Sequence, residues 1–258
     1  MVARSVSLKN IVDDNTVHDE VILNIFYDVL NNQVIQYYND KLEQLFSFAI
    51  GNKDLFTNIR VTVDKPVAEV LHEYIEKWVS AYIKDRENDK LLNPLKNYGE
   101  RDEALVSRVR ASTGASEEVV QLFIDGHYLF MSAENMNGAI LEQYLADVLE
   151  PNGWLWCAGA IYRAIDFCYF GENEIVLLQV KNKYNTENSS SSAIRIGTDI
   201  IKWNRLTRPR RESGLDRPLP NWQALQEIVN MPQLNNHLTE NSYLEYIEQY
   251  STRQLDTL

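Results

Sequence analysis

Apolar residues recur at helical spacing through the first half of the chain. Residues 18–50 and 67–83 place apolar side chains three and four positions apart, which is the spacing of a single buried helix face. The first segment predicts two helices that separate near Asn31, and residues 58–63 suit a short strand ahead of the next helix. We therefore expect a mainly helical N-terminal part over residues 1–133.

Two further helices are predicted before the pattern changes. The charged residues 84–103 look like a connection, and Ser116 can cap a helix over about residues 116–131. The next helix covers about residues 137–150 and carries an apolar stripe with Glu142 at its margin. Glu142 is either an ordinary surface carboxylate or an acid directed at a site on the elements that follow.

Short apolar runs then replace the helical spacing. Residues 154–157, 161–169 and 175–181 each suit a strand, and the short turns between them predict antiparallel pairing. Side chains alternate along a strand. The third run therefore places Gln179 and Lys181 on one face and only apolar side chains on the other.

An acid and an amine come close together if this hairpin forms. Asp166, near the end of the second run, can lie beside Gln179 and Lys181. A carboxylate suits Mg²⁺, which usually takes one or two carboxylates, and an ammonium beside it can stabilise charge on a phosphate or its attacking water. We interpret these residues as a candidate hydrolytic site, with a solvated hairpin end as the alternative.

The charge of the chain is unevenly distributed. Its net charge of −12 speaks against a nucleic-acid partner, but residues 181–217 hold nine basic and four acidic residues, or +5, and the remainder carries −17. A protein needs to neutralise phosphates only where it touches them. The basic segment is thus a candidate phosphate-binding surface, although a solvated Arg-rich loop also fits residues 208–217.

Short hydrogen-bonding side chains follow the candidate site. Residues 182–192 lead into a predicted helix over residues 190–205, whose first turn offers free N–H groups to phosphate. Short hydroxyls and amides also suit base edges, and Arg195 can pair with guanine. A flexible Ser-rich linker is the alternative. Two more helices, one from Asn221 and one over residues 240–250, end the pattern.

The remaining features point to a protein of the cytoplasm. No apolar run is long enough to cross a membrane, and no leader with a cleavage site is apparent at the N-terminus. Cys157 and Cys168 match no zinc motif and are expected to be buried thiols. His72 and His127 have no spaced partner, so we expect ordinary histidines rather than metal ligands.

Four sequence segments carry a resemblance to a known family. They are AENMNGAILEQYLA, AIDF, QVKNKYNTENSSSSAIR and GTDIIKW, within residues 133–223. Together they resemble type II restriction endonucleases of the PD-(D/E)XK superfamily, in the group of SinI and AvaII. The resemblance implies an α/β (α+β) fold with a mixed central sheet flanked by helices. It implies a nuclease core over residues 134–258, with a DNA-recognition segment at 182–217.

The resemblance also implies roles for the site residues. Asp166 would be the metal-binding acid, Lys181 the catalytic lysine, and Glu142 the helix acid often found in the superfamily. Gln179 stands where the superfamily usually has Glu or Asp, which leaves the number of metal ions open. The implied metal ligands are thus Asp166, Gln179 and Glu142.

The group's enzymes cut double-stranded DNA at a short palindrome of the type GGWCC, with Mg²⁺ and as homodimers. The residues implied to contact DNA are Lys183, Asn185, Glu187, Asn188, Ser189, Ser190, Ser191, Ser192, Arg195, Lys202, Arg205, Arg208 and Arg210. Among them the last three are the candidates for phosphate. Another kind of DNA nuclease, for repair or junction resolution, and a catalytically inactive DNA-binding module are the alternative functions.

Overall fold

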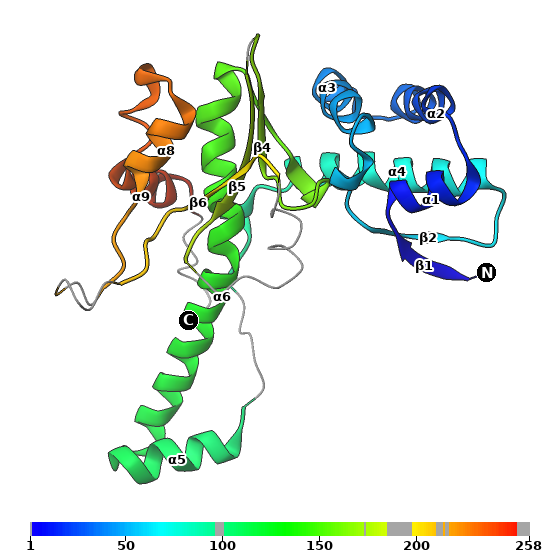
Figure 1. Ribbon diagram of the computed structural model, residues 1–258. Helices are drawn as coiled ribbons and strands as arrows, with labels where there is room; N and C mark the ends of the chain where they lie inside the picture. The colour runs from blue at the N-terminus through cyan, green and yellow to red at the C-terminus, as the bar shows by residue number, and fades with distance from the viewer. Residues whose placement is uncertain are drawn as a thin grey trace.

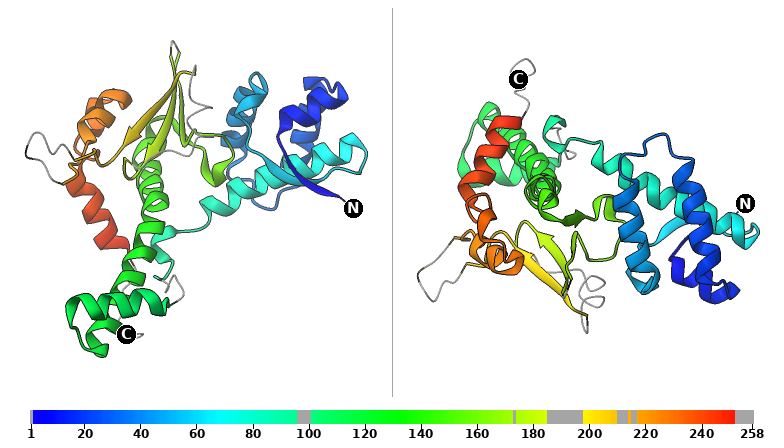
Figure 2. Two further views of the ribbon diagram at one scale, coloured as in Figure 1. Left: turned by 60° about the horizontal axis from the view of Figure 1, so that its bottom comes forward. Right: turned by 90° about the horizontal axis from the view of Figure 1, so that it is seen from above.

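The computed structural model describes residues 2–95, 101–172, 174–184, 198–209, 214 and 217–251. Within these ranges a mixed four-stranded sheet lies between two groups of helices, with one long helix, α6, running past it (Figure 1). The mixed sheet with flanking helices agrees with the predicted fold class. The N-terminal helices lie on one side of the sheet, and α8 (Trp222–Val229) and α9 (Glu240–Tyr250) lie on the other (Figures 1 and 2).

The N-terminal part packs around helix α4. It contains β1 (Ala3–Val6), α1 (Leu8–Asn15), α2 (Asp19–Asn31), α3 (Asn39–Ile50), β2 (Ile59–Thr62) and α4 (Val67–Arg86). The predicted separation of the first two long helices near Asn31 is confirmed. Trp78 of α4 is fully buried, and its indole Nε1 donates to the Ile161 carbonyl at 3.0 Å, which ties this part to the sheet region.

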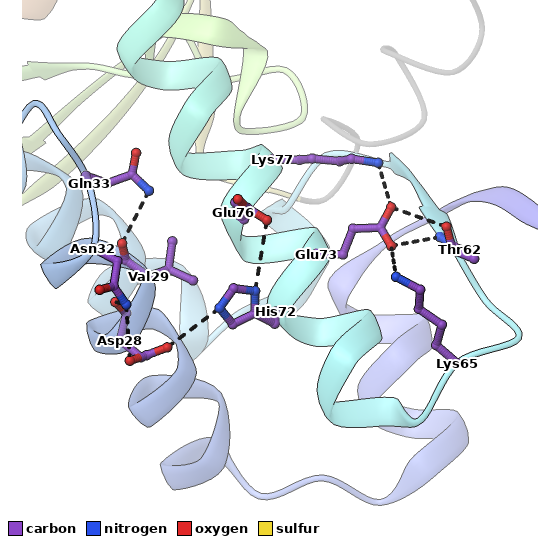
Figure 3. A network of polar contacts seen from close by, with 10 residues as sticks. All are labelled: Asp28, Val29, Asn32, Gln33, Thr62, Lys65, His72, Glu73, Glu76 and Lys77. Atoms are coloured by element: carbon purple, nitrogen blue, oxygen red, sulfur yellow. Dashed lines mark hydrogen bonds and ion pairs between the residues drawn. The ribbon is translucent and has the colours of Figure 1, made fainter.

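His72 takes part in a surface network on α4, as Figure 3 shows. Its imidazole lies 3.6 Å from the carboxylate of Asp28 on α2 and 4.0 Å from that of Glu76 one turn along. On another side of α4, the Glu73 carboxylate forms an ion pair with Lys77 at 2.7 Å and accepts a hydrogen bond from the backbone N–H of Thr62 at 3.3 Å. These contacts fasten α2 and β2 to α4.

The sheet has the strand order β3 (Trp154–Trp156), β4 (Phe167–Phe170), β5 (Ile175–Lys181) and β6 (Ile200–Asn204). The first three strands are antiparallel neighbours, as predicted, and β6 pairs with β5 in parallel. The helix predicted over residues 190–205 is wrong in its last third, because Ile200–Asn204 forms this edge strand. Parallel pairing needs a partner distant in sequence, so local periodicity did not reveal it.

Helix α6 (Glu117–Leu149) is continuous over 33 residues. The break predicted between residues 131 and 137 is therefore wrong, since a helix interior tolerates Gly138 at a cost of only ~1 kcal/mol. Ser116 caps it as predicted, with its Oγ accepting from the Val119 N–H at 3.4 Å. Only the second half of α6 lies along the sheet and the C-terminal helices, while the first half projects away with α5 (Figure 1).

Helix α5 (Glu103–Thr113) begins where the sequence predicted a connection to end. Asp102 caps it by accepting from the Ala104 N–H at 2.9 Å, and Gly114 ends it in the left-handed region with φ 67°. An Asp cap and a Gly stop are ordinary helix signals. The helix was not predicted because the residues between Asp102 and Gly114 are mostly polar.

The predicted C-terminal helices are confirmed as α8 (Trp222–Val229) and α9 (Glu240–Tyr250). The two cysteines are buried free thiols, as expected, with their Sγ atoms 3.4 Å apart behind β3 and β4. Burial raises the pKa of Cys157 well above its usual value. Across the residues covered by the structure, no helix has the length and apolar character that crossing a bilayer requires.

Candidate active site

Asp166 is held at the point where β4 meets β5. The residue immediately precedes β4 rather than lying near a strand's end, as the sequence had suggested, because the strand begins only at Phe167. Its backbone N–H donates to the Leu178 carbonyl at 2.8 Å. Its carboxylate Oδ2 accepts from the Val180 N–H at 2.6 Å. These two bonds fix the carboxylate beside the C-terminal end of β5, where Lys181 stands.

Glu142 reaches the same place from helix α6. Its carboxylate Oε2 accepts a hydrogen bond from the indole Nε1 of Trp156, on β3, at 3.3 Å. The helix stripe around it, including Leu141 and Leu145, is fully buried. The packing of α6 therefore directs Glu142 toward the sheet instead of toward solvent, which answers the question that the sequence left open.

The electrostatics of the site show that Glu142, Asp166 and Lys181 lie within reach of one another. Burial and, after it, the charge of Asp166 raise the pKa of Glu142, Trp156 and Lys181 oppose them, and the resulting pKa is about 8. Burial likewise raises the pKa of Asp166, against the effects of Lys181 and the Val180 N–H. Because the two carboxylates repel each other, the pair retains a proton at a higher pH than a single carboxylate would. A bound cation would remove the repulsion and release that proton.

This pair of acids fits a magnesium ion. Mg²⁺ binds one or two carboxylates and keeps several waters, and a cation between Glu142 and Asp166 would remove the repulsion that raises the pKa of Glu142. No cluster of three or more His, Cys, Asp or Glu side chains suited to a metal occurs in the described ranges. Carboxylate oxygens are ligands of the kind that Mg²⁺ prefers, whereas structural zinc sites use mainly Cys and His.

Gln179 lies on β5 between Leu178 and Val180, the two residues whose backbone groups bond Asp166. It is 2% exposed and stands opposite Lys202 in the parallel pair with β6. Lys181, two residues further along β5, lies close enough to Asp166 for its charge to lower the pKa of that acid. The structure brings Glu142, Asp166 and Lys181 together, while a role for Gln179 in metal binding stays a prediction.

The basic residues implied to contact DNA lie in different settings. Arg208 is exposed and stacks on the ring of Tyr184, with the guanidinium 5.8 Å from the ring centre. Lys183 is partly exposed and pairs with Glu134 on α6. Lys202 is partly buried on β6. The other predicted contacts in this segment lie outside the described residues, namely Asn185, Glu187, Asn188, Ser189, Ser190, Ser191, Ser192, Arg195 and Arg210.

Arg205 requires a correction. The sequence offered it as a phosphate contact, but it is 8% exposed and its guanidinium is already engaged. Its Nε donates to the Asn182 side chain at 2.8 Å, its Nη1 pairs with Glu240, and the Tyr243 ring lies 5.2 Å from its centre. Arg205 therefore holds β6 to α9, because a buried guanidinium needs its hydrogen bonds met within the protein.

Two residues near the site were missed from the sequence. Asp85 adds to the negative potential that raises the pKa of Glu142. It accepts from the Gly159 N–H at 2.8 Å and pairs with Lys90 at 2.5 Å. Trp156 donates to Glu142, as described above. Asp85 lies on α4, far away in sequence, so only tertiary packing reveals it.

Comparison of the sequence with known proteins identifies a family. The sequence model of the SinI restriction endonuclease family matches residues 73–253. The type II restriction enzyme Eco47I of Escherichia coli is 40% identical over 151 residues, which cover 58% of this chain and 61% of the relative. The type II restriction enzyme SinI of Salmonella infantis is 38% identical over the same length and shares. The matched region thus spans about three fifths of each relative. On the extent of the family match, the chain belongs to the SinI restriction endonuclease family.

Proposed function

We propose that the protein is a type II restriction endonuclease that cleaves double-stranded DNA at a short palindromic site with Mg²⁺. The observation that carries the proposal is the meeting of Glu142, Asp166 and Lys181 at the end of β5. Family membership and the names of the two relatives support the same reaction. The resemblance of the sequence favours a target of the GGWCC type and a homodimer, and the sequence features described above favour a place in the cytoplasm.

Each residue has a distinct part in the proposed hydrolysis. The reaction adds a water oxygen to phosphorus and breaks the bond to the leaving sugar oxygen, while negative charge grows on the phosphate oxygens. Glu142 and Asp166 would hold a divalent cation, which acts as a Lewis acid on the phosphate when bound. Lys181 donates to the phosphate or the attacking water and stabilises the developing charge.

The raised pKa of Glu142 belongs to the same mechanism. Without a cation, the two acids retain a proton because burial and mutual repulsion disfavour the doubly charged pair. Val180 fixes the Asp166 carboxylate by a 2.6 Å bond to Oδ2, and Oδ1 would then be available to hold a cation. Trp156 orients Glu142 in the same way.

Digestion of a plasmid of known sequence tests the proposal. The wild-type protein with Mg²⁺ should yield discrete bands, and EDTA should abolish them. Lys181→Ala and Asp166→Asn should each reduce cleavage at least ~1,000-fold, with circular dichroism unchanged. Lys84→Ala is the matched control, because Lys84 is an exposed lysine on α4, and it should cut like wild type.

Other outcomes identify the alternative functions. A smear, or a preference for branched DNA, would indicate a nuclease of the repair or junction-resolving kind. Sequence-specific binding in EDTA without cleavage in any divalent metal would indicate an inactive DNA-binding module. Full activity of Lys181→Ala would remove the proposed active site.

A further inference from the structure

The hairpin formed by α5 and the first half of α6 projects from the rest of the molecule. We name this segment, residues 103–131, the α5–α6 arm (Figures 1 and 2). Eight of its large apolar side chains are more than a third exposed, including Leu105, Leu122, Phe123 and Phe130. Leu122 is 70% and Phe130 is 78% exposed.

The arm does not bury its own apolar surface. Among its residues only Val106 on α5 and Val120 on α6 are buried. The cleft between the two helices has a volume of about 430 Å³ and is lined by apolar side chains, among them Leu105, Phe123 and Met131. Two helices bury an apolar core poorly unless further helices pack on them.

The amount of exposed surface is that of a stable interface. Large apolar and aromatic side chains present ~150–250 Å² each when fully exposed. The eight side chains are between 36% and 78% exposed, so together they offer on the order of 700 Å². Each partner in a standard protein interface contributes ~800 Å², and soluble monomers rarely expose patches larger than a few hundred Å².

The charges of the arm point to a second copy of this chain as the occupant. Exposed Arg108 and Arg110 lie on the C-terminal half of α5, and the acid on this helix, Glu103, pairs with Arg101 just ahead of it. Exposed Glu117, Glu118 and Asp125 lie on the first half of α6. In a twofold dimer every contact occurs twice: if a residue of α5 in one copy contacts a residue of α6 in the other, the same two residues also meet with the copies exchanged. Apposing the α5 of one copy with the α6 of the other would pair these opposite charges twice. The excess of acids disfavours DNA phosphates as the occupant.

We propose that two copies of this protein associate through the α5–α6 arm and complete a four-helix packing between them. The inference deepens the proposed function and rests on it, since a palindromic target calls for a twofold protein. It also places the contact ~30 Å from the active site along α6, because Leu122 and Glu142 are 20 residues apart on one helix. Substitutions on the arm therefore leave the site chemistry untouched.

Sedimentation velocity of the full chain over a range of concentrations tests the inference. Wild type should sediment as a dimer. The double variant Leu122→Glu and Phe130→Glu should raise the dimer dissociation constant on the order of 100-fold or more, because it buries charge in an apolar contact. The control is Val34→Glu with Tyr37→Glu, two residues that are 99% and 85% exposed away from the arm, and it should stay dimeric.

Charge exchange tests the orientation of the two copies. Arg108→Glu with Arg110→Glu, and separately Glu117→Lys with Glu118→Lys, should each weaken the dimer. An equimolar mixture of the two variants should form a heterodimer, because each α5 then meets an α6 of opposite charge. Circular dichroism should show unchanged helix content in every variant.

The outcomes separate the interface from the nuclease. A monomeric wild type at tens of micromolar, or an arm variant as dimeric as the control, overturns the inference, even if the DNA is cut at discrete sites. Conversely, an arm-dependent dimer that cuts no DNA under any condition refutes the proposed function and leaves the interface standing.

Discussion

The two halves of helix α6 have similar apolar content and opposite surroundings. In the second half, Leu141 and Leu145 are fully buried and Glu142 points to the sheet. In the first half, Leu122 and Phe130 remain exposed. Helical spacing of apolar residues therefore reveals which side chains need a partner, whereas the fold determines whether the partner is in the same chain.

The contrast should appear most strongly in stability. Leu145→Ala removes a fully buried side chain and should lower the free energy of unfolding by about 2–5 kcal/mol. Leu122→Ala should change it by less than about 0.5 kcal/mol in the monomer. Urea unfolding at several protein concentrations measures both. An effect of Leu122→Ala that grows with concentration would reflect its loss from the dimer, whereas the Leu145 effect should be independent of concentration.

The same contrast separates two arginines of the basic segment. Arg205→Met leaves Glu240 without its buried partner and should destabilise the protein by about 1–3 kcal/mol. Arg208→Met removes an exposed guanidinium and should leave stability unchanged while weakening DNA binding and its salt dependence. Thermal unfolding and DNA titrations at two salt concentrations distinguish the pair. Equal losses of DNA affinity at unchanged stability would contradict the structural role of Arg205.

The sequence predicted those elements whose signals are local. The helices around Asn31, the hairpins of β3, β4 and β5, and the last two helices follow from short-range spacing and turn residues. The parallel strand β6 did not, because its partner β5 lies across a long connection. The continuity of α6 was not predicted either, because the polar segment ahead of Gly138 resembles a break between two helices.

Some residues of the candidate site could likewise be predicted from the sequence, and others could not. Asp166, Lys181 and Glu142 could be singled out from the order of a helix, two strands and their charged residues. The contribution of Asp85 could not, because α4 meets the site only through packing. Burial of Arg205 was also hidden, since its partner Glu240 lies 35 residues away.

The buried half of α6 should make stability depend on pH. The pKa of Glu142 is about 8 in the folded protein against a usual 4.5. The folded state thus binds this proton more tightly than the unfolded state, and stability falls as pH rises from about 5 through 8. Glu142→Gln carries no such charge, so at pH 9 in EDTA it should melt a few degrees above wild type. The gap should close at pH 4 and shrink with added Mg²⁺, and a variant less stable than wild type at pH 9 would contradict the burial argument.

The smallest expected effect concerns the partner of Glu142. Trp156→Phe keeps an aromatic ring against α6 but removes the Nε1 donor that lowers the pKa of Glu142. A net hydrogen bond of ~0.7 kcal/mol corresponds to about half a pKa unit. The pH at which Mg²⁺ binding reaches half its maximum, followed by calorimetry, should therefore rise by that amount. Metal-free stability at pH 9, where Glu142 is ionised, should fall by the lost hydrogen bond in addition to the lost packing. The comparison with Phe123→Leu on the exposed half of α6 completes the experiment, because that substitution leaves the site untouched and should leave the midpoint where it is. A midpoint that moves down in Trp156→Phe would mean that the indole does not donate to the charged form of Glu142.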